Sequence, residues 1–148
     1  MPDTSNFLTH EHLPLTAERW RELNMAVLLI THDLGVVAGS ADRVVVMYAG
    51  QVVETAATRA LFATPQHPYT EGLLASIPRL DQPRERLRSI PGSVPPATAW
   101  PTGCRFHPRC PYAWDKCRTE EPPLLETGTA GHSARCWLVA EPARRTAR

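Results

Sequence analysis

The distribution of proline is the feature that most constrains how this chain can fold. Ten of its 15 prolines lie between residues 78 and 123, namely Pro78, Pro83, Pro91, Pro95, Pro96, Pro101, Pro108, Pro111, Pro122 and Pro123. Because proline lacks a backbone N–H and restricts its own φ, this spacing excludes long helices and central β-strands there. Such a segment forms few backbone hydrogen bonds of its own, so it needs the preceding domain or a bound metal to hold its shape.

The residues before this segment predict regular elements of both kinds, which is typical of an α/β fold. An apolar run at residues 26–30 predicts a strand that is covered on both faces. The predicted helices are residues 15–23, 34–41, 56–63 and a helix that opens at Pro68 and runs to Ile77. The predicted β-hairpin has strands at residues 43–48 and 51–55, joined by Ala49-Gly50. Asp33 is placed to cap the helix at 34–41.

Four cysteines, Cys104, Cys110, Cys117 and Cys136, lie in and after the proline-rich segment, separated by five, six and 18 residues. Structural zinc sites usually contain closer cysteine pairs. Wider spacing suits an iron–sulfur cluster, and Cys110-Pro111 resembles the Cys-Pro ending of bacterial ferredoxin motifs, although neither ferredoxin spacing is matched. The residues alone leave a cluster, zinc, free thiols and disulfides open.

Charge and hydropathy restrict the class of protein. A formal net charge of +1 offers no electrostatic case for binding nucleic acid. No apolar run approaches the roughly 20 residues of a membrane-spanning helix, and the N-terminus lacks the pattern of a signal peptide. We therefore expect a cytosolic protein, in which reduced cysteines are better explained as metal ligands than as disulfides.

Several motifs, in order along the chain, resemble a known family. Residues 27–38 (VLLITHDLGVVA) resemble the switch-histidine region of ABC transporter ATPase subunits, and residues 41–54 resemble the hairpin that follows it. Three further motifs are similar to the C-terminal extension of the oligopeptide/dipeptide importers: residues 67–78 (HPYTEGLLASIP), 90–96 (IPGSVPP) and 103–111 (GCRFHPRCP). Together these matches cover roughly residues 18–137.

The resemblance implies an α/β remnant of an ABC ATPase core, followed by an irregular, proline-rich extension that binds a cluster. The expected organisation is an unmatched leader (1–17), the C-terminal part of the ATPase core (18–66), the extension with its four cysteines (67–138) and a disordered tail (139–148).

The resemblance also implies roles for individual residues. His32 corresponds to the switch histidine, which is expected to contact the γ-phosphate and position the attacking water; the alternative is a capping or surface histidine. Cys104, Cys110, Cys117 and Cys136 are expected to hold a [4Fe-4S] cluster, with zinc as the alternative. His107 and His132 are expected near the ligands rather than among them, and Trp114 and Trp137 are expected to shield the site.

Motifs needed for ATP hydrolysis are missing. The only lysine, Lys116, has no glycine-rich loop before it, so the chain lacks a phosphate-binding P-loop. An apolar run that ends in Asp-Glu and a Ser-Gly-Gly signature are absent as well. We therefore predict that this chain alone does not hydrolyse ATP, and that ATP and Mg²⁺ bind only in a complete subunit.

The function implied is part of the ATP-binding subunit of a peptide importer, at the inner face of the cell membrane. Its expected partners are a second ABC ATPase subunit and two transmembrane permeases, and nucleic acid is not among them. Two alternatives remain: a stand-alone metal-binding or iron–sulfur module that docks on importer subunits, and a regulator that inactivates heterodimers with complete ATPases.

Overall fold

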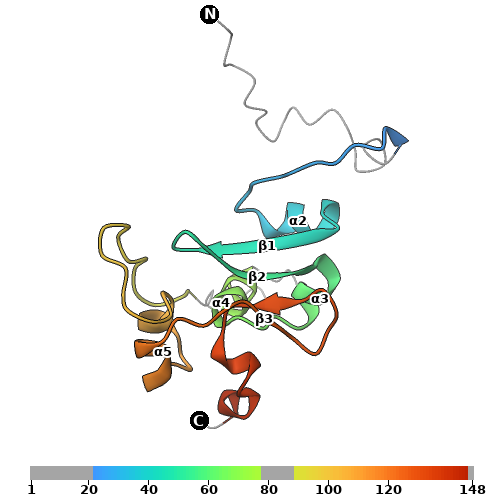
Figure 1. Ribbon diagram of the computed structural model, residues 1–148. Coiled ribbons are helices and arrows are strands. Elements are labelled where there is room, and N and C mark those ends of the chain that lie inside the picture. Colours follow the sequence, from blue (N-terminus) through green and yellow to red (C-terminus); the bar gives the residue numbers. More distant parts are fainter. Residues whose placement is uncertain (1–21, 78–88, 147–148) are drawn as a thin grey trace, which may run out of the picture. The chain divides into compact units, whose positions relative to one another are not determined.

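A computed structural model describes residues 22–77 and 89–146 of the chain (Figure 1). The chain divides into two compact units, residues 1–32 and residues 33–148. No helix among the described residues is long and apolar enough to cross a membrane.

The described part of the first unit, residues 22–32, contains no strand. The strand predicted at 26–30 is therefore wrong for the described structure: this segment is extended without a pairing partner, and Leu28 and Ile30 are 89% and 90% exposed. A strand is stabilised by its hydrogen-bonded neighbours, and an apolar run cannot replace them. The helix predicted at 15–23 lies almost wholly outside the described residues.

The second unit contains short helices and a small antiparallel sheet. Its α-helices are α2 (Leu34–Ser40), α3 (Thr58–Ala63), α4 (Pro68–Ala75) and α5 (Asp115–Thr119), and its 3₁₀ helices are η2 (His107–Arg109), η3 (Trp137–Val139) and η4 (Pro142–Arg145). Its strands are β1 (Arg43–Tyr48), β2 (Gln51–Ala57), β3 (Leu125–Glu126) and β4 (Ser133–Ala134), in the order β1-β2-β4-β3. Figure 1 shows the C-terminal strands (orange to red) beside the hairpin (cyan to green).

The predicted hairpin is confirmed and extends two residues further than expected. Ala49 and Gly50 both have positive φ, as a tight two-residue hairpin turn requires. Ala56 pairs with Val44 and is fully buried, so residues 56 and 57 continue β2 instead of opening a helix. The helical segment predicted at 56–63 therefore begins only at Thr58, because pairing with β1 overrides the helix propensity of alanine.

Two predicted helix starts are confirmed by their capping geometry. The Asp33 carboxylate accepts hydrogen bonds from the backbone N–H groups of Gly35 and Val36, at 2.8 and 3.2 Å. Helix α4 opens at Pro68, and the His67 ring caps it by accepting from Tyr69 N at 3.1 Å. Satisfying these N–H groups is the ordinary way in which a short helix is started.

The hairpin and the proline-rich segment share one hydrophobic core. The buried core cluster consists of Val44, Val46, Tyr48, Val53, Ala56, Leu61 and Phe106. Phe106, which comes from the proline-rich segment, packs edge-on against Tyr48 with ring centroids 5.1 Å apart. Strand β4 adds to the sheet by pairing with β2 at Glu54 and Thr55. The preceding domain thus supplies the packing surface that this irregular segment lacks.

The C-terminal residues are also tied to this unit. Residues 142–145, which fall in the segment expected to be a disordered tail, form η4. The Arg145 guanidinium donates to the carbonyl oxygen of Gln66 at 2.7 Å and lies 3.5 Å from the Glu71 carboxylate. These contacts fasten η4 to the start of α4.

Candidate metal centre

The four cysteines line a single cavity in the second unit. The cavity contains about 300 Å³ of space, part of it open to solvent. None of the four thiols is in a disulfide, and Cys117 and Cys136 are buried. The rest of the lining is largely apolar and aromatic: His67, Pro68, Phe106, His107, Trp114, Pro122, Trp137 and Leu138. The fold thus brings four cysteines that are up to 32 positions apart in sequence to one cavity.

Short helical turns position each cysteine. Cys104 and Cys110 flank η2, Cys117 lies on α5, and Cys136 directly precedes η3. The backbone at Cys104 is joined directly to α5, because Cys104 N donates to the carbonyl oxygen of Cys117 at 2.9 Å. Since prolines prevent longer elements here, these turns and their cross-links fix where the sulfur atoms lie.

Gly103 allows this close approach of Cys104 to α5. It has a φ of +70°, and a Cβ atom at this position would lie 2.5 Å from the carbonyl oxygen of Cys117. That distance is far inside van der Waals contact, and the atom it would meet belongs to the backbone. Any other residue here must therefore separate Cys104 from Cys117.

We expect Gly103→Ala to lower the free energy of unfolding by about 2–4 kcal/mol, through the combined strain and overlap. Urea unfolding of the purified chain measures this. Gly128→Ala is the matched control, because a Cβ at Gly128 meets nothing within 4 Å, and its effect should stay within about 0.5 kcal/mol. Equal effects of the two substitutions would show that the contact with Cys117 is not constrained as described.

Burial dominates the electrostatics of the thiols. It raises the pKa of Cys110 and of Cys136 to about 12, and it also raises the pKa of Cys104 and Cys117. Nearby thiols further raise the pKa of Cys104, Cys110 and Cys136, whereas backbone hydrogen bonds, such as those from Tyr112 to Cys110 and from Leu138 to Cys136, oppose the shift. Without a compensating positive charge the thiols stay protonated at neutral pH, and a bound metal is one such charge.

The arrangement does not converge on a single point. Among the described residues, no three His, Cys, Asp or Glu side chains are grouped so that they could hold one metal ion. Tetrahedral zinc places its ligands about 2.0–2.3 Å from one centre. The four thiols therefore line one space without forming a group around a single point.

The histidines near the cysteines have different positions. His107 lines the cavity, and its Nδ1 donates to the carbonyl oxygen of Cys104 at 3.0 Å. His132 does not line it; its Nε2 lies 2.7 Å from the buried Glu54 carboxylate. His67 does line the cavity, and burial, together with the charge of Arg145, lowers its pKa to about 3. Sequence reasoning missed His67, and its place directly before Pro68 at a helix start was the available signal.

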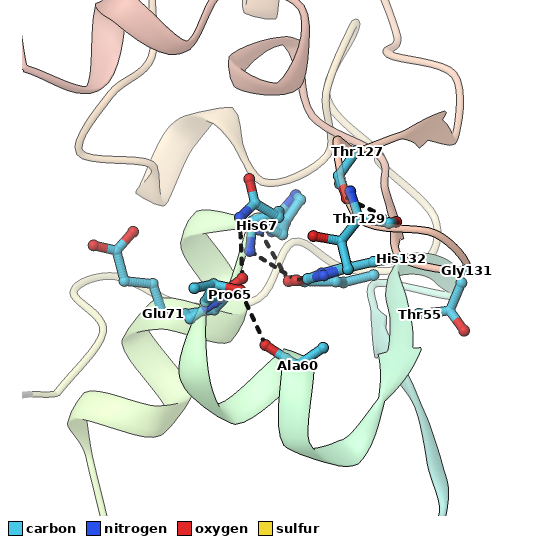
Figure 2. A network of polar contacts seen from close by, with 12 residues as sticks. Thr55, Ala60, Pro65, His67, Glu71, Thr127, Thr129, Gly131 and His132 are labelled. Atoms are coloured by element: carbon cyan, nitrogen blue, oxygen red, sulfur yellow. Dashed lines mark hydrogen bonds and ion pairs between the residues drawn. The ribbon is translucent and has the colours of Figure 1, made fainter.

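Glu54 organises a polar network next to the cavity. Its fully buried carboxylate accepts hydrogen bonds from Gln66 N at 2.7 Å and from His67 N at 2.9 Å, in addition to the contact with His132. Figure 2 shows His67 and His132 entering this network from two separate segments of the chain. One side chain of β2 is thereby hydrogen-bonded both to the start of α4 and to His132, which directly precedes β4.

His32 lies in the first unit and is exposed, whereas all four cysteines lie in the second. Trp114 and Trp137 do line the cavity, where sequence reasoning placed them. The indole N–H of Trp137 donates to the carbonyl oxygen of Glu120 at 3.2 Å, which fixes its ring at the cavity wall.

Several known proteins are similar to this chain in sequence. Residues 53–117 match the family described as the oligopeptide/dipeptide transporter, C-terminal region. The chain is 54% identical over 129 residues to the oligopeptide transport ATP-binding protein AppD of Bacillus subtilis, and 47% identical over 133 residues to the dipeptide transport ATP-binding protein DppD of Escherichia coli. These alignments cover 87% and 90% of this chain but only 39% and 40% of the relatives, so the chain spans about two fifths of their length. The chain therefore corresponds to a C-terminal part of an ATP-binding subunit of the oligopeptide/dipeptide ABC transporter family.

Proposed function

We propose that this chain serves as the C-terminal part of a subunit that couples ATP hydrolysis to peptide uptake. The observation that carries the proposal is the similarity, over 87% to 90% of the chain, to proteins named for oligopeptide and dipeptide transport. The phosphate-binding loop, the Asp-Glu motif and the signature must come from sequence that this chain does not contain. The proposed partners are a second ATP-binding subunit and two membrane permeases, which would hold the protein at the inner face of the membrane.

Within that subunit we assign His32 the role of switch histidine. Its side chain is exposed, and the residue directly precedes Asp33, which caps α2. An imidazole at the end of this motif can donate a hydrogen bond to the γ-phosphate and hold the attacking water. ATP and Mg²⁺ would be bound by the complete subunit, so His32 acts on a nucleotide that other segments hold.

We further propose that Cys104, Cys110, Cys117 and Cys136 hold a [4Fe-4S] cluster. The donor set suits the group, because four thiols that form no disulfide line one cavity. Thiolates are the usual ligands of such clusters. A bound cluster would supply positive charge to the buried thiols and join the loops around η2, α5 and η3. Its proposed role is structural, because it would replace the regular hydrogen bonding that the prolines prevent.

A chimera tests the transport function. The segment of AppD that aligns with this chain would be replaced by the corresponding residues of this chain, and oligopeptide uptake would be measured in cells that lack AppD. We expect uptake to be retained, because 54% of the aligned residues are identical. The same chimera with His32→Ala should assemble with its partners but lose at least about tenfold in ATP-driven uptake, since transition-state positioning is removed.

Asp33→Asn in the same chimera is the matched control for the histidine. Asparagine keeps the helix cap beside His32, so uptake should stay close to that of the unsubstituted chimera. A chimera that assembles normally but takes up no peptide would overturn the proposal. It would favour the stand-alone module that docks on importer subunits.

A further inference from the structure

His67 is the one fully buried histidine of the cysteine cavity, and its contacts determine what its second ring nitrogen can offer there. The residue is 1% exposed and lines the same cavity as the four thiols. It lies at the junction of β2, α4 and the cysteine loops. None of the roles described above uses its Nε2 atom.

Three contacts hold the His67 ring in one place. Its backbone N–H donates to the Glu54 carboxylate at 2.9 Å, and its Nδ1 accepts from Tyr69 N at 3.1 Å. The ring also packs against Phe106, with centroids 5.6 Å apart and an interplanar angle of 56°. Contacts to a strand, a helix and the hydrophobic core therefore limit both rotation and displacement of the imidazole.

The hydrogen bond at Nδ1 determines where the ring carries its proton. A backbone N–H can only donate, so Nδ1 must present a lone pair to it. Neutral imidazole then carries its proton on Nε2, and Nε2 is a donor. The only side-chain hydrogen bond of His67 among the described residues is the one at Nδ1. What the ring can offer to the cavity is therefore an N–H group, not a lone pair for a metal.

The cavity offers mainly sulfur atoms as acceptors for this donor. Apart from the two histidines and four cysteines, its lining consists of proline, phenylalanine, tryptophan and leucine. Tryptophan can only donate, and the indole N–H of Trp137 is already bonded to Glu120 O. His107 uses its Nδ1 proton for Cys104 O, so neutral His107 has no proton for the sulfur atoms, and its Nε2 is the one side-chain acceptor of the lining other than sulfur.

We propose that His67 is a positioning residue of this centre: when the four cysteines hold a cluster, its Nε2–H would donate a hydrogen bond to sulfur there and raise the reduction potential of the cluster. This inference rests on the cluster proposed above. An N–H donor favours the state with more negative charge on sulfur, which is the reduced state, and hydrogen bonds to sulfur are among the factors that set cluster potentials.

Two substitutions separate this role from helix capping. In His67→Asn the amide oxygen can take the place of Nδ1 and cap α4, but no donor remains at the position of Nε2. In His67→Gln the longer amide can place an N–H near the position of Nε2, but the cap is lost. If His67 only caps the helix, the two variants should differ in stability and not in reduction potential. If His67 donates to sulfur, His67→Asn should have the lower reduction potential of the two.

The experiment is a redox titration of the anaerobically purified full chain, followed by visible absorption and electron paramagnetic resonance, with urea unfolding in parallel. We expect His67→Asn to make one-electron reduction roughly tenfold less favourable, as for loss of one hydrogen bond to a charged group, which corresponds to about 59 mV. His67→Gln should keep a potential close to that of the unsubstituted chain while losing stability.

Other outcomes overturn the inference in distinguishable ways. Unchanged potentials in both variants would show that His67 donates nothing to the sulfur atoms. Equal decreases in both would assign the effect to ring packing. His67→Asn could fail to retain the cluster. In that case His67→Gln decides alone: a tenfold change in its one-electron reduction equilibrium would contradict the donor role, because this variant keeps a donor. An unsubstituted chain without iron and sulfide overturns the proposed cluster, and with it this role.

Discussion

Glu54→Ala is expected to lower the free energy of unfolding by about 3–5 kcal/mol, because it removes a buried acceptor that three donors share. Alanine would leave three donors without their acceptor: Gln66 N, His67 N and His132 Nε2. His132 is only 1% exposed, so water cannot readily replace the carboxylate. Each unsatisfied buried group costs about 1–3 kcal/mol. Urea unfolding of the purified chain measures the loss.

Glu126→Ala is the matched control for this substitution. Glu126 also accepts a hydrogen bond from a side chain, that of Ser133 at 2.6 Å, but it is exposed and lies on the edge strand β3. Its removal should cost less than about 1 kcal/mol. Glu54→Gln keeps the side-chain volume but turns an NH₂ group toward backbone N–H groups, so it too should destabilise the chain. A Glu54→Gln variant as stable as the unsubstituted chain would show that the carboxylate is not required.

Cys136→Ser is expected to remove most of the bound iron and sulfide and to unfold the loops around the cavity. The unsubstituted chain, purified without oxygen, should be brown and contain about four iron and four sulfide per chain, the composition of the proposed cluster. Serine is a much weaker ligand for iron than a thiolate, and binding energy at such a site is also folding energy. Iron and sulfide analysis, visible absorption and limited proteolysis of residues 100–140 measure both effects.

His107→Ala is the informative comparison for Cys136→Ser. His107 lines the same cavity but is expected not to be a ligand, so this variant should keep nearly all of its iron and sulfide. A loss as large as that of Cys136→Ser would mean that a histidine replaces one of the cysteines as ligand. One zinc per chain with no visible absorption in the unsubstituted protein would overturn the cluster altogether.

Local rules of the chain predicted several elements correctly. The Ala49-Gly50 turn, the Asp33 cap and the opening of α4 at Pro68 depend on energies between residues close in sequence, so the residues at those positions suffice to predict them. Proline spacing likewise predicted short elements only: between residues 89 and 134 the longest helix or strand is the five-residue α5. The family resemblance carried by the motifs is confirmed by the comparisons.

Contacts between distant residues were beyond those rules. Nothing in the sequence around Glu54 predicts that it is buried or that it meets His132, which lies 78 residues further along. The two-residue strands β3 and β4 are too short to produce an alternating pattern, and the apolar run at 26–30 lacked the neighbours that a strand requires. His67 was overlooked because its burial depends on Phe106 and on the cysteine loops.

By itself the sequence determined which segments could be regular, which family the chain resembles and which residues carry the thiols. Only the tertiary structure decided that the four cysteines line one cavity, that His67 lines it too, and that Glu54 ties the hairpin to both His67 and His132. The physical reason is the range of the interactions. Caps and turns depend on neighbouring residues, whereas a cavity and a buried carboxylate exist only after distant segments have been packed against one core.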